Sequence, residues 1–87
     1  MKRVLFIADM NDIVKNMNEA MLPFFRVQLC TADEEFIRKM IPIYQPDIVL
    51  VFLNQLRLIQ VQELKVILDE NEKLPVVMVG SMYEFRE

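Results

Sequence analysis

The stretch of sequence that decides the fold reads Pro46-Asp47-Ile48-Val49-Leu50-Val51-Phe52-Leu53-Asn54. After Asp47 it carries no charge, and every residue up to Asn54 is valine, isoleucine, leucine or phenylalanine. Such a run is typical of a strand covered on both faces, as in a parallel sheet. The carboxyl end of the strand, which Phe52 occupies here, is where open α/β sheets place their functional groups.

Three further segments have the composition of strands. Residues 4–8 form an uninterrupted apolar run, residues 26–30 alternate between apolar and polar side chains, and residues 75–81 begin with a proline followed by four apolar residues. The alternating segment is the most polar of the three, which predicts that it lies at an edge of the sheet. We expect residues 75–81 to form a fourth, buried strand.

Between the strands, apolar residues recur at the spacing of amphipathic helices. The three stripes are Ile13, Met17, Ala20 and Met21; Phe36, Ile37, Met40, Ile41 and Tyr44; and Val61, Leu64, Ile67 and Leu68. Pro23 is expected to stop the first helix, and Pro42 to distort or end the second helix near Ile41. Either Thr31 or Asp33 can cap the second helix, because Thr31 precedes a glutamate by the spacing of a capping box. Residues 54–60 are expected to form a connection.

The resulting order of elements is strand-helix-strand-helix-strand-helix-strand, without a repeat or a linker. At 87 residues the chain is one domain at most. Strands that alternate with helices predict an α/β fold with a parallel sheet and right-handed crossovers. With residues 26–30 at one edge, the predicted strand order is 2-1-3-4, with helices on both faces, which is flavodoxin-like.

Composition narrows the classes of function. The net charge is −3 and the basic residues are scattered, which argues against nucleic-acid binding by this segment. The chain has no histidine and one cysteine, Cys30, which excludes a zinc or iron–sulfur site and an internal disulfide. No run approaches the roughly 18 apolar residues of a membrane helix, and residues 4–8 are too short for a signal peptide. We therefore expect a cytoplasmic protein that does not bind a membrane.

The pattern Pro-Asp-(apolar)4-x-(apolar)-Asn resembles the third strand of the receiver domains of two-component response regulators. Asp9, directly after the first strand, and the segment Leu74-Pro75-Val76-Val77-Met78 are further matches. In that family x is the aspartate that accepts a phosphoryl group, and here x is Phe52. The resemblance covers residues 1–87 and implies a single receiver-like domain whose fifth strand is absent from this chain.

The resemblance also implies where the phosphorylation pocket of a receiver would lie. In the family, two acidic residues after the first strand, the acceptor aspartate and a backbone carbonyl hold a magnesium ion. A threonine or serine at the end of the fourth strand contacts the phosphoryl group, and a lysine after the fifth strand neutralises it. The matching positions in this chain are Ala8, Asp9, Phe52, Asn54, Gly80 and Ser81.

These positions depart from the family where the chemistry requires oxygen atoms. Ala8 replaces the first acidic residue, Phe52 replaces the acceptor, and Gly80 replaces the hydroxyl residue, with Ser81 one place later. Magnesium prefers several hard oxygen ligands, and Asp9 alone supplies one carboxylate. We therefore expect no cofactor, no enzymatic activity and no aspartyl phosphorylation.

The resemblance then implies a non-phosphorylatable receiver, the N-terminal part of a longer bacterial signalling or transcription regulator with its output domain after residue 87. Without a fifth strand, residues 76–79 form an open sheet edge, so we expect a protein partner or a homodimer. The fourth strands, or the tails at residues 82–87, would then be shared between copies.

Two alternatives stay open. One is a conventional phosphorylated receiver with Asp47 or Asp9 as the acceptor. The other is a small α/β carrier or nucleotide-binding protein, although residues 9–12 do not form a glycine-rich loop.

Overall fold

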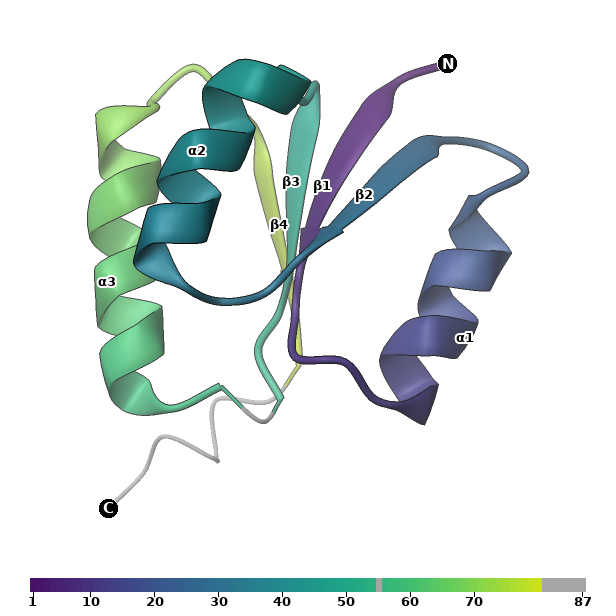
Figure 1. Ribbon diagram of the computed structural model, residues 1–87, viewed down its shortest axis with the longest axis horizontal. Coiled ribbons are helices and arrows are strands. Elements are labelled where there is room, and N and C mark those ends of the chain that lie inside the picture. Colours follow the sequence, from purple (N-terminus) through teal and green to yellow (C-terminus); the bar gives the residue numbers. More distant parts are fainter. Residues whose placement is uncertain (55, 81–87) are drawn as a thin grey trace.

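The computed structural model describes residues 1–54 and 56–80 of the chain. The elements, in chain order, are β1 (Arg3–Ile7), α1 (Asp12–Met21), β2 (Arg26–Cys30), α2 (Glu34–Tyr44), β3 (Ile48–Phe52), α3 (Leu58–Glu70) and β4 (Val76–Val79). The strands form one parallel sheet in the order β2-β1-β3-β4, and helices lie on both of its faces (Figure 1). The predicted fold class and strand order are therefore confirmed, and the fold is flavodoxin-like.

The sheet separates two clusters of buried side chains. Helices α2 and α3 cover one face, where alternate residues of β1 and β3 meet the inner side of α3. This larger cluster is centred on Leu5, Ile7, Val49, Val51, Leu64 and Ile67. Helix α1 covers part of the other face, where the buried residues are Phe6, Ala8, Val14 and Phe52. Each of the two central strands is thus apolar on both sides, as the uninterrupted runs predicted.

Helix α1 presents a different face to the sheet from the one predicted. Val14 is fully buried and Met17 and Met21 are half-buried, whereas Ile13 is 58% exposed and Ala20 is exposed. The inclusion of Ile13 and Ala20 in the buried stripe was therefore wrong. The spacing of Val14, Met17 and Met21 places them in one row along the helix, and Ile13 lies about 100° around the axis from Val14.

Helix α2 continues past its proline, so of the two expected effects of Pro42, distortion or an end near Ile41, the end was wrong. Pro42 lies inside the helix, which ends at Tyr44. Pro42 is exposed and close to the C-terminus, so the one helical hydrogen bond that it removes leaves a carbonyl that water can reach. Gln45 closes the helix in the left-handed conformation (φ 51°), and its N–H donates to the Ile41 carbonyl at 3.0 Å.

The start of α2 resolves which residue caps the helix. The Asp33 carboxylate accepts hydrogen bonds from the backbone N–H of Glu35 at 3.0 Å and of Phe36 at 3.3 Å. Asp33 is therefore the N-cap in place of Thr31. Phe36 is 53% exposed, so the prediction that it belongs to the buried stripe was wrong. Ile37 is the residue of this turn that packs into the core, and Phe36 lies about 100° around the helix axis from it.

Helix α3 begins three residues before the predicted stripe, so the connection after β3 is shorter than expected. Leu58 and Ile59 are exposed and gave no periodic signal, but the Arg57 N–H donates to the Gln60 side chain at 2.8 Å and fixes the first turn. The predicted buried residues Leu64, Ile67 and Leu68 are buried. None of the helices within residues 1–54 and 56–80 has the length and apolar content needed to cross a membrane.

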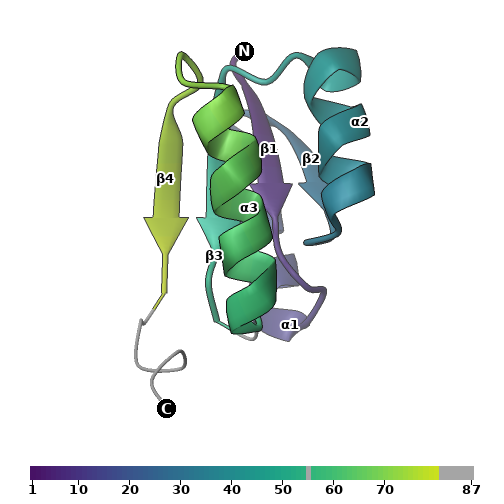
Figure 2. The same ribbon diagram turned by 90° about the vertical axis from the view of Figure 1, so that its left-hand side faces the viewer.

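Strand β4 is more exposed than expected for a buried strand. The exposed fractions of Val77, Met78 and Val79 are 44%, 51% and 37%. β4 is the outermost strand of the described sheet, and α1 lies behind β1 and β2 rather than behind β4 (Figure 2). The expectation of burial was therefore wrong. Among the described residues no helix covers Val77 and Val79 on the α1 side of β4, and Met78, on the side of α3, borders an open hollow.

The core under α3 should control stability. Ile67 is 1% exposed, whereas its neighbour Val66 is 54% exposed. We predict that Ile67→Val lowers the free energy of unfolding by about 0.5–1.5 kcal/mol, because one buried methylene is lost. The control Val66→Ala should change it by less than Ile67→Val, and urea denaturation followed by circular dichroism measures both. Equal effects would contradict the assigned packing of α3.

Candidate functional site

The carboxyl ends of the four parallel strands lie at one edge of the sheet, the usual position of sites in open α/β folds. Ala8 directly follows β1, Phe52 ends β3, and Gly80 directly follows β4. Asn54 lies two residues after β3. These predicted pocket positions therefore share one edge of the sheet, while Ser81 lies outside the described residues.

Two of these positions are filled by apolar side chains that face α1. Phe52 is 5% exposed and lies in one buried cluster with Phe6, Ala8 and Val14. The aromatic ring therefore occupies the space between the end of the sheet and α1. The four buried side chains contain only carbon, so they offer no oxygen that could accept a phosphoryl group or bind magnesium.

Asp9 borders a different space, on the side of the edge where α2 and α3 begin. It lines a hollow of about 760 Å³ together with residues 31–35 and with Arg57, Ile59, Gln60 and Glu63. Phe52, Asn54 and Gly80 do not line this hollow. Of the predicted pocket positions within the described residues, this hollow is lined by Asp9 alone.

Several polar groups of this hollow take part in local structure. The Asp33 carboxylate caps α2, and the Glu34 carboxylate lies 3.2 Å from Nε of Arg38. Gln60 accepts a hydrogen bond from the Arg57 N–H, and its Nε2 lies 3.4 Å from the Ala32 carbonyl. Among the described residues, no three acidic or cysteine side chains converge as metal ligands.

Gly80 and Asn54 mark a close approach between the end of β4 and the loop after β3. Gly80 has φ +132°, a conformation that residues with a Cβ atom rarely adopt. A Cβ atom on Gly80 would lie 2.6 Å from Oδ1 and 3.2 Å from the backbone N of Asn54. Gly80 is therefore required by the backbone, and a hydroxyl-bearing residue would not fit this position without rearrangement.

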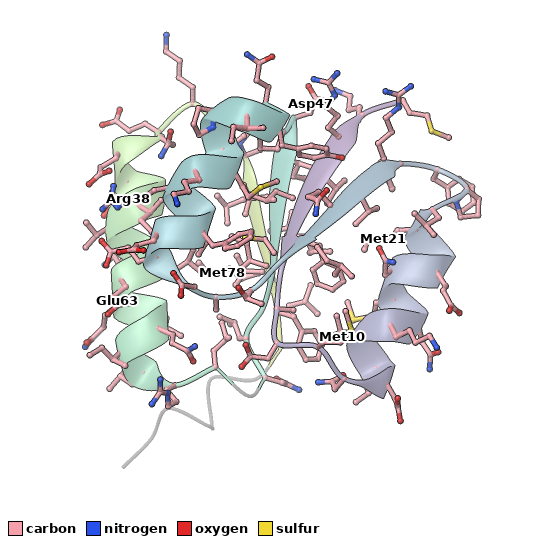
Figure 3. The ribbon with its side chains drawn as sticks, in the orientation of Figure 1. Met10, Met21, Arg38, Asp47, Glu63 and Met78 are labelled. Atoms are coloured by element: carbon pink, nitrogen blue, oxygen red, sulfur yellow. The ribbon has the colours of Figure 1, made fainter. Side chains whose placement is uncertain are left out.

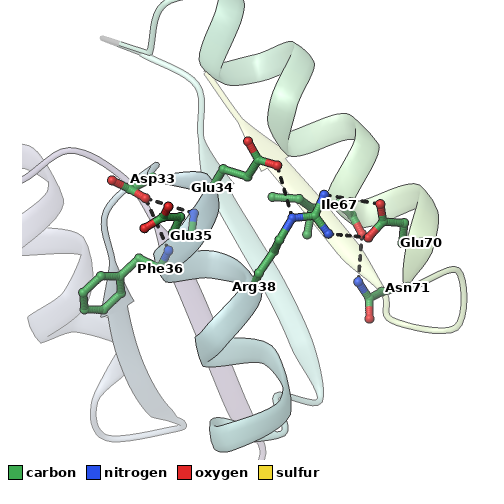
Figure 4. A network of polar contacts seen from close by, with 8 residues as sticks. All are labelled: Asp33, Glu34, Glu35, Phe36, Arg38, Ile67, Glu70 and Asn71. Carbon is green, nitrogen blue, oxygen red and sulfur yellow. Dashed lines mark hydrogen bonds and ion pairs between the residues drawn. The ribbon is translucent and has the colours of Figure 1, made fainter.

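Arg38 joins the two helices that cover the larger cluster (Figure 4). Its Nη1 lies 2.5 Å and its Nη2 3.3 Å from the two carboxylate oxygens of Glu70, and its Nε lies 3.2 Å from Glu34. Hydrogen bonding to Glu70, and then to Glu34, raises the pKa of Arg38, and the bond to Arg38 lowers the pKa of Glu70. The ion pair is solvent-exposed, so it orients the helices more than it stabilises them.

The contact between Arg38 and Glu70 was not predicted from the sequence. The spacing of Glu34 and Arg38, four residues apart in a predicted helix, was a usable signal for their ion pair. No spacing in the sequence connects Arg38 to Glu70, because their contact depends on how α2 and α3 pack.

Cys30, at the end of β2, is buried, and its Sγ lies 3.4 Å from the Thr31 carbonyl. Burial, with a smaller contribution from the negative charge of Asp33, raises the pKa of the Cys30 thiol to about 11. The thiol therefore stays protonated at neutral pH and is a poor nucleophile.

The backbone strain at Gly80 should be measurable. We predict that Gly80→Ala lowers the free energy of unfolding by about 1–3 kcal/mol, because alanine tolerates this conformation poorly. Adding Asn54→Ala should recover only part of the loss, since that change relieves the clash with Oδ1 but not the strain in φ. Thermal denaturation of the single and double variants measures both effects. Unchanged stability in Gly80→Ala would contradict the assigned geometry.

The Arg38–Glu70 ion pair should make stability depend on pH in one direction. The folded protein lowers the pKa of Glu70, so the pair contributes fully only above the ordinary carboxyl value of 4.5. We predict that the wild type is slightly more stable than Glu70→Gln at neutral pH. This difference should disappear as the pH falls below 4.5 and Glu70 becomes protonated. Glu72→Gln, which removes a neighbouring exposed carboxylate outside this pair, is the control, and a difference that is constant with pH would contradict the assignment.

Comparison with known proteins gives no relative from which a role could be transferred. No family model, no curated protein and no solved structure matches the chain. The fold class therefore follows from the topology of the sheet, and function has to be inferred from the residues at its edges.

Proposed function

We propose that this chain is a receiver-like interaction module of a signalling or transcription regulator, acting in the cytoplasm through protein contacts without aspartyl phosphorylation. The flavodoxin-like topology and the match at residues 46–54 support the resemblance to receivers. The observation that carries the proposal is the position of Phe52, buried at the end of β3 among Phe6, Ala8 and Val14. Where a receiver needs an exposed carboxylate, this chain has an aromatic ring packed into its core.

Two features of the sheet edge support the loss of metal and phosphate chemistry. Asp9 supplies one carboxylate, and it borders a hollow that Phe52 does not reach. Gly80 has a positive φ and lies close to Asn54, so the position that carries a hydroxyl group in receivers has no side chain here. Charge positioned around the phosphoryl group is the main contribution of a protein to its transfer, and these positions do not provide it.

The alternative acceptor Asp47 is disfavoured by its location. It directly precedes β3, and its carboxylate accepts a hydrogen bond from the backbone N–H of Arg3 at 2.8 Å. Figure 3 shows Asp47 at one end of the sheet and Met10, which lies in the loop after β1, toward the other end. Asp47 therefore ties the amino ends of two strands together.

A nucleotide-binding or carrier function is likewise not favoured. The loop between β1 and α1 contains no glycine, and its Asn11 side chain accepts a hydrogen bond from the Val14 N–H at 2.9 Å to cap α1. The loop thus uses its polar side chain to start the helix, whereas a phosphate-binding loop needs close approach of bare backbone.

Incubation with acetyl phosphate and magnesium tests the proposal. We predict that the protein gains no acid-labile phosphate, because Phe52 has no oxygen to accept it. Intact-mass spectrometry measures the outcome, and a conventional receiver labelled in parallel serves as the positive control. A mass increase of one phosphoryl group would overturn the proposal, and its loss in Asp9→Asn or Asp47→Asn would identify the acceptor.

A further inference from the structure

The outer edge of β4 carries backbone groups directed away from the sheet. The Val49 N–H donates to the Pro75 carbonyl at 2.9 Å, and the Leu53 N–H donates to the Val79 carbonyl at 2.7 Å. Successive residues of a strand direct their backbone groups to opposite sides, so Val76 and Met78 point their N–H and C=O groups away from β3. In the described sheet, β4 has no neighbour on that side.

Pro75 does not protect this edge. A proline at a sheet edge usually blocks pairing because it lacks an N–H group. Here the backbone of Pro75 faces β3, as its hydrogen bond with Val49 shows, so the missing donor lies on the inner side. The donors and acceptors of the outer side are intact.

The side chains along β4 are apolar on both faces of the sheet. Val76 and Met78 lie on the side of α2 and α3, where they border a hollow of about 690 Å³ that is also lined by residues of α3. Val77 and Val79 pair in register with Leu50 and Phe52 and therefore lie on the side of α1. An added strand that fits this edge must be uncharged and apolar on both of its faces.

Charge decides which strand of this chain can meet β4. The opposite edge of the sheet is β2, where Arg26 and Gln28 are exposed. Pairing β2 of one copy with β4 of another would place the Arg26 charge beside the apolar edge, and it would repeat into an open filament. Pairing β4 with β4 matches two uncharged strands and closes after two copies.

We propose that the partner of this module is a second copy of the chain, joined through antiparallel pairing of the two β4 strands into one continuous sheet. The proposal rests on the proposed function, since it names the protein contact that replaces phosphorylation. A two-fold axis perpendicular to the sheet keeps α2 and α3 of both copies on the same face. Val76 and Met78 of each copy then exchange both backbone hydrogen bonds with Met78 and Val76 of the other.

This register places Val77 directly opposite Val77 of the second copy. Only residues 75–79 are needed for it, so it avoids Gly80, whose positive φ ends the extended strand. The two Val77 residues form the close, non-hydrogen-bonded type of pair, with Cα atoms about 4.5 Å apart. A charged side chain at position 77 would therefore face the same charged side chain of the second copy across the two-fold axis.

Substitution at Val77 tests this symmetry. Sedimentation velocity at micromolar concentrations should show a dimer for the wild type and a monomer for Val77→Lys and for Val77→Glu. Like charges facing each other should weaken dimerisation at least about tenfold. An equimolar mixture of the two variants should recover the dimer, because lysine then faces glutamate. Val77 is 44% exposed, so the fold tolerates both changes, and circular dichroism checks this.

Val66→Lys and Val66→Glu are the matched controls, because Val66 is also an exposed valine but lies on α3. Both should remain dimeric. Hydrogen exchange of the wild type adds an independent readout: the amides of Val76 and Met78 should be protected at high concentration and exchange faster on dilution.

A wild type that stays monomeric, a Val77→Lys variant that stays dimeric, or a mixture that fails to re-form the dimer would overturn the proposed pairing. These results leave the proposed function standing as long as acetyl phosphate does not label the protein. Labelling would overturn the proposed function whether or not the chain dimerises, so the two failures can be told apart.

Discussion

The burial of β1 and β3 on both faces is the constraint on which the rest of the structure depends. Leu5, Ile7, Val49 and Val51 have no exposed surface on the side of α2 and α3, and Phe6 has none on the side of α1. A parallel sheet is stable only when helices cover both sides, and three short helices supply this cover unequally. Two helices share one face, while the single helix on the other face lies over β1 and β2. The interior is therefore complete at the centre of the sheet and incomplete toward β4.

Hydrophobic patterning predicted the fold because that pattern follows from burial. The uninterrupted apolar run at residues 4–8 predicted a central strand, and the alternating pattern at residues 26–30 predicted an edge strand. The strand order was predicted from this difference. The details that failed depend on neighbours rather than on local pattern. Val14 lies toward the sheet in place of Ile13 because of where α1 packs, and α2 continues through Pro42 because the lost hydrogen bond is at an exposed helix end.

The candidate site was predictable in position but not in geometry. Alignment of the strands placed Ala8, Phe52 and Gly80 at one edge of the sheet, and they lie there. The sequence could not predict that Asp9 lines a different space from the one that Phe52 fills. The face toward which a residue just after a strand points depends on the path of the loop, and no local pattern gives that path. The apolar side chains of Ala8 and Phe52 at this edge are packed into the core, so this end of the sheet contributes to stability.

The buried thiol of Cys30 has a consequence for how the molecule responds to its surroundings. Oxidants and electrophiles react with thiolates, and a thiol whose pKa is raised to about 11 offers almost none of this form while β2 stays in place. The protection of this thiol and the stability of the β2 edge are thus linked. While β2 stays paired, Cys30 is shielded from oxidants, and a molecule whose β2 edge has come away exposes the thiol to covalent modification.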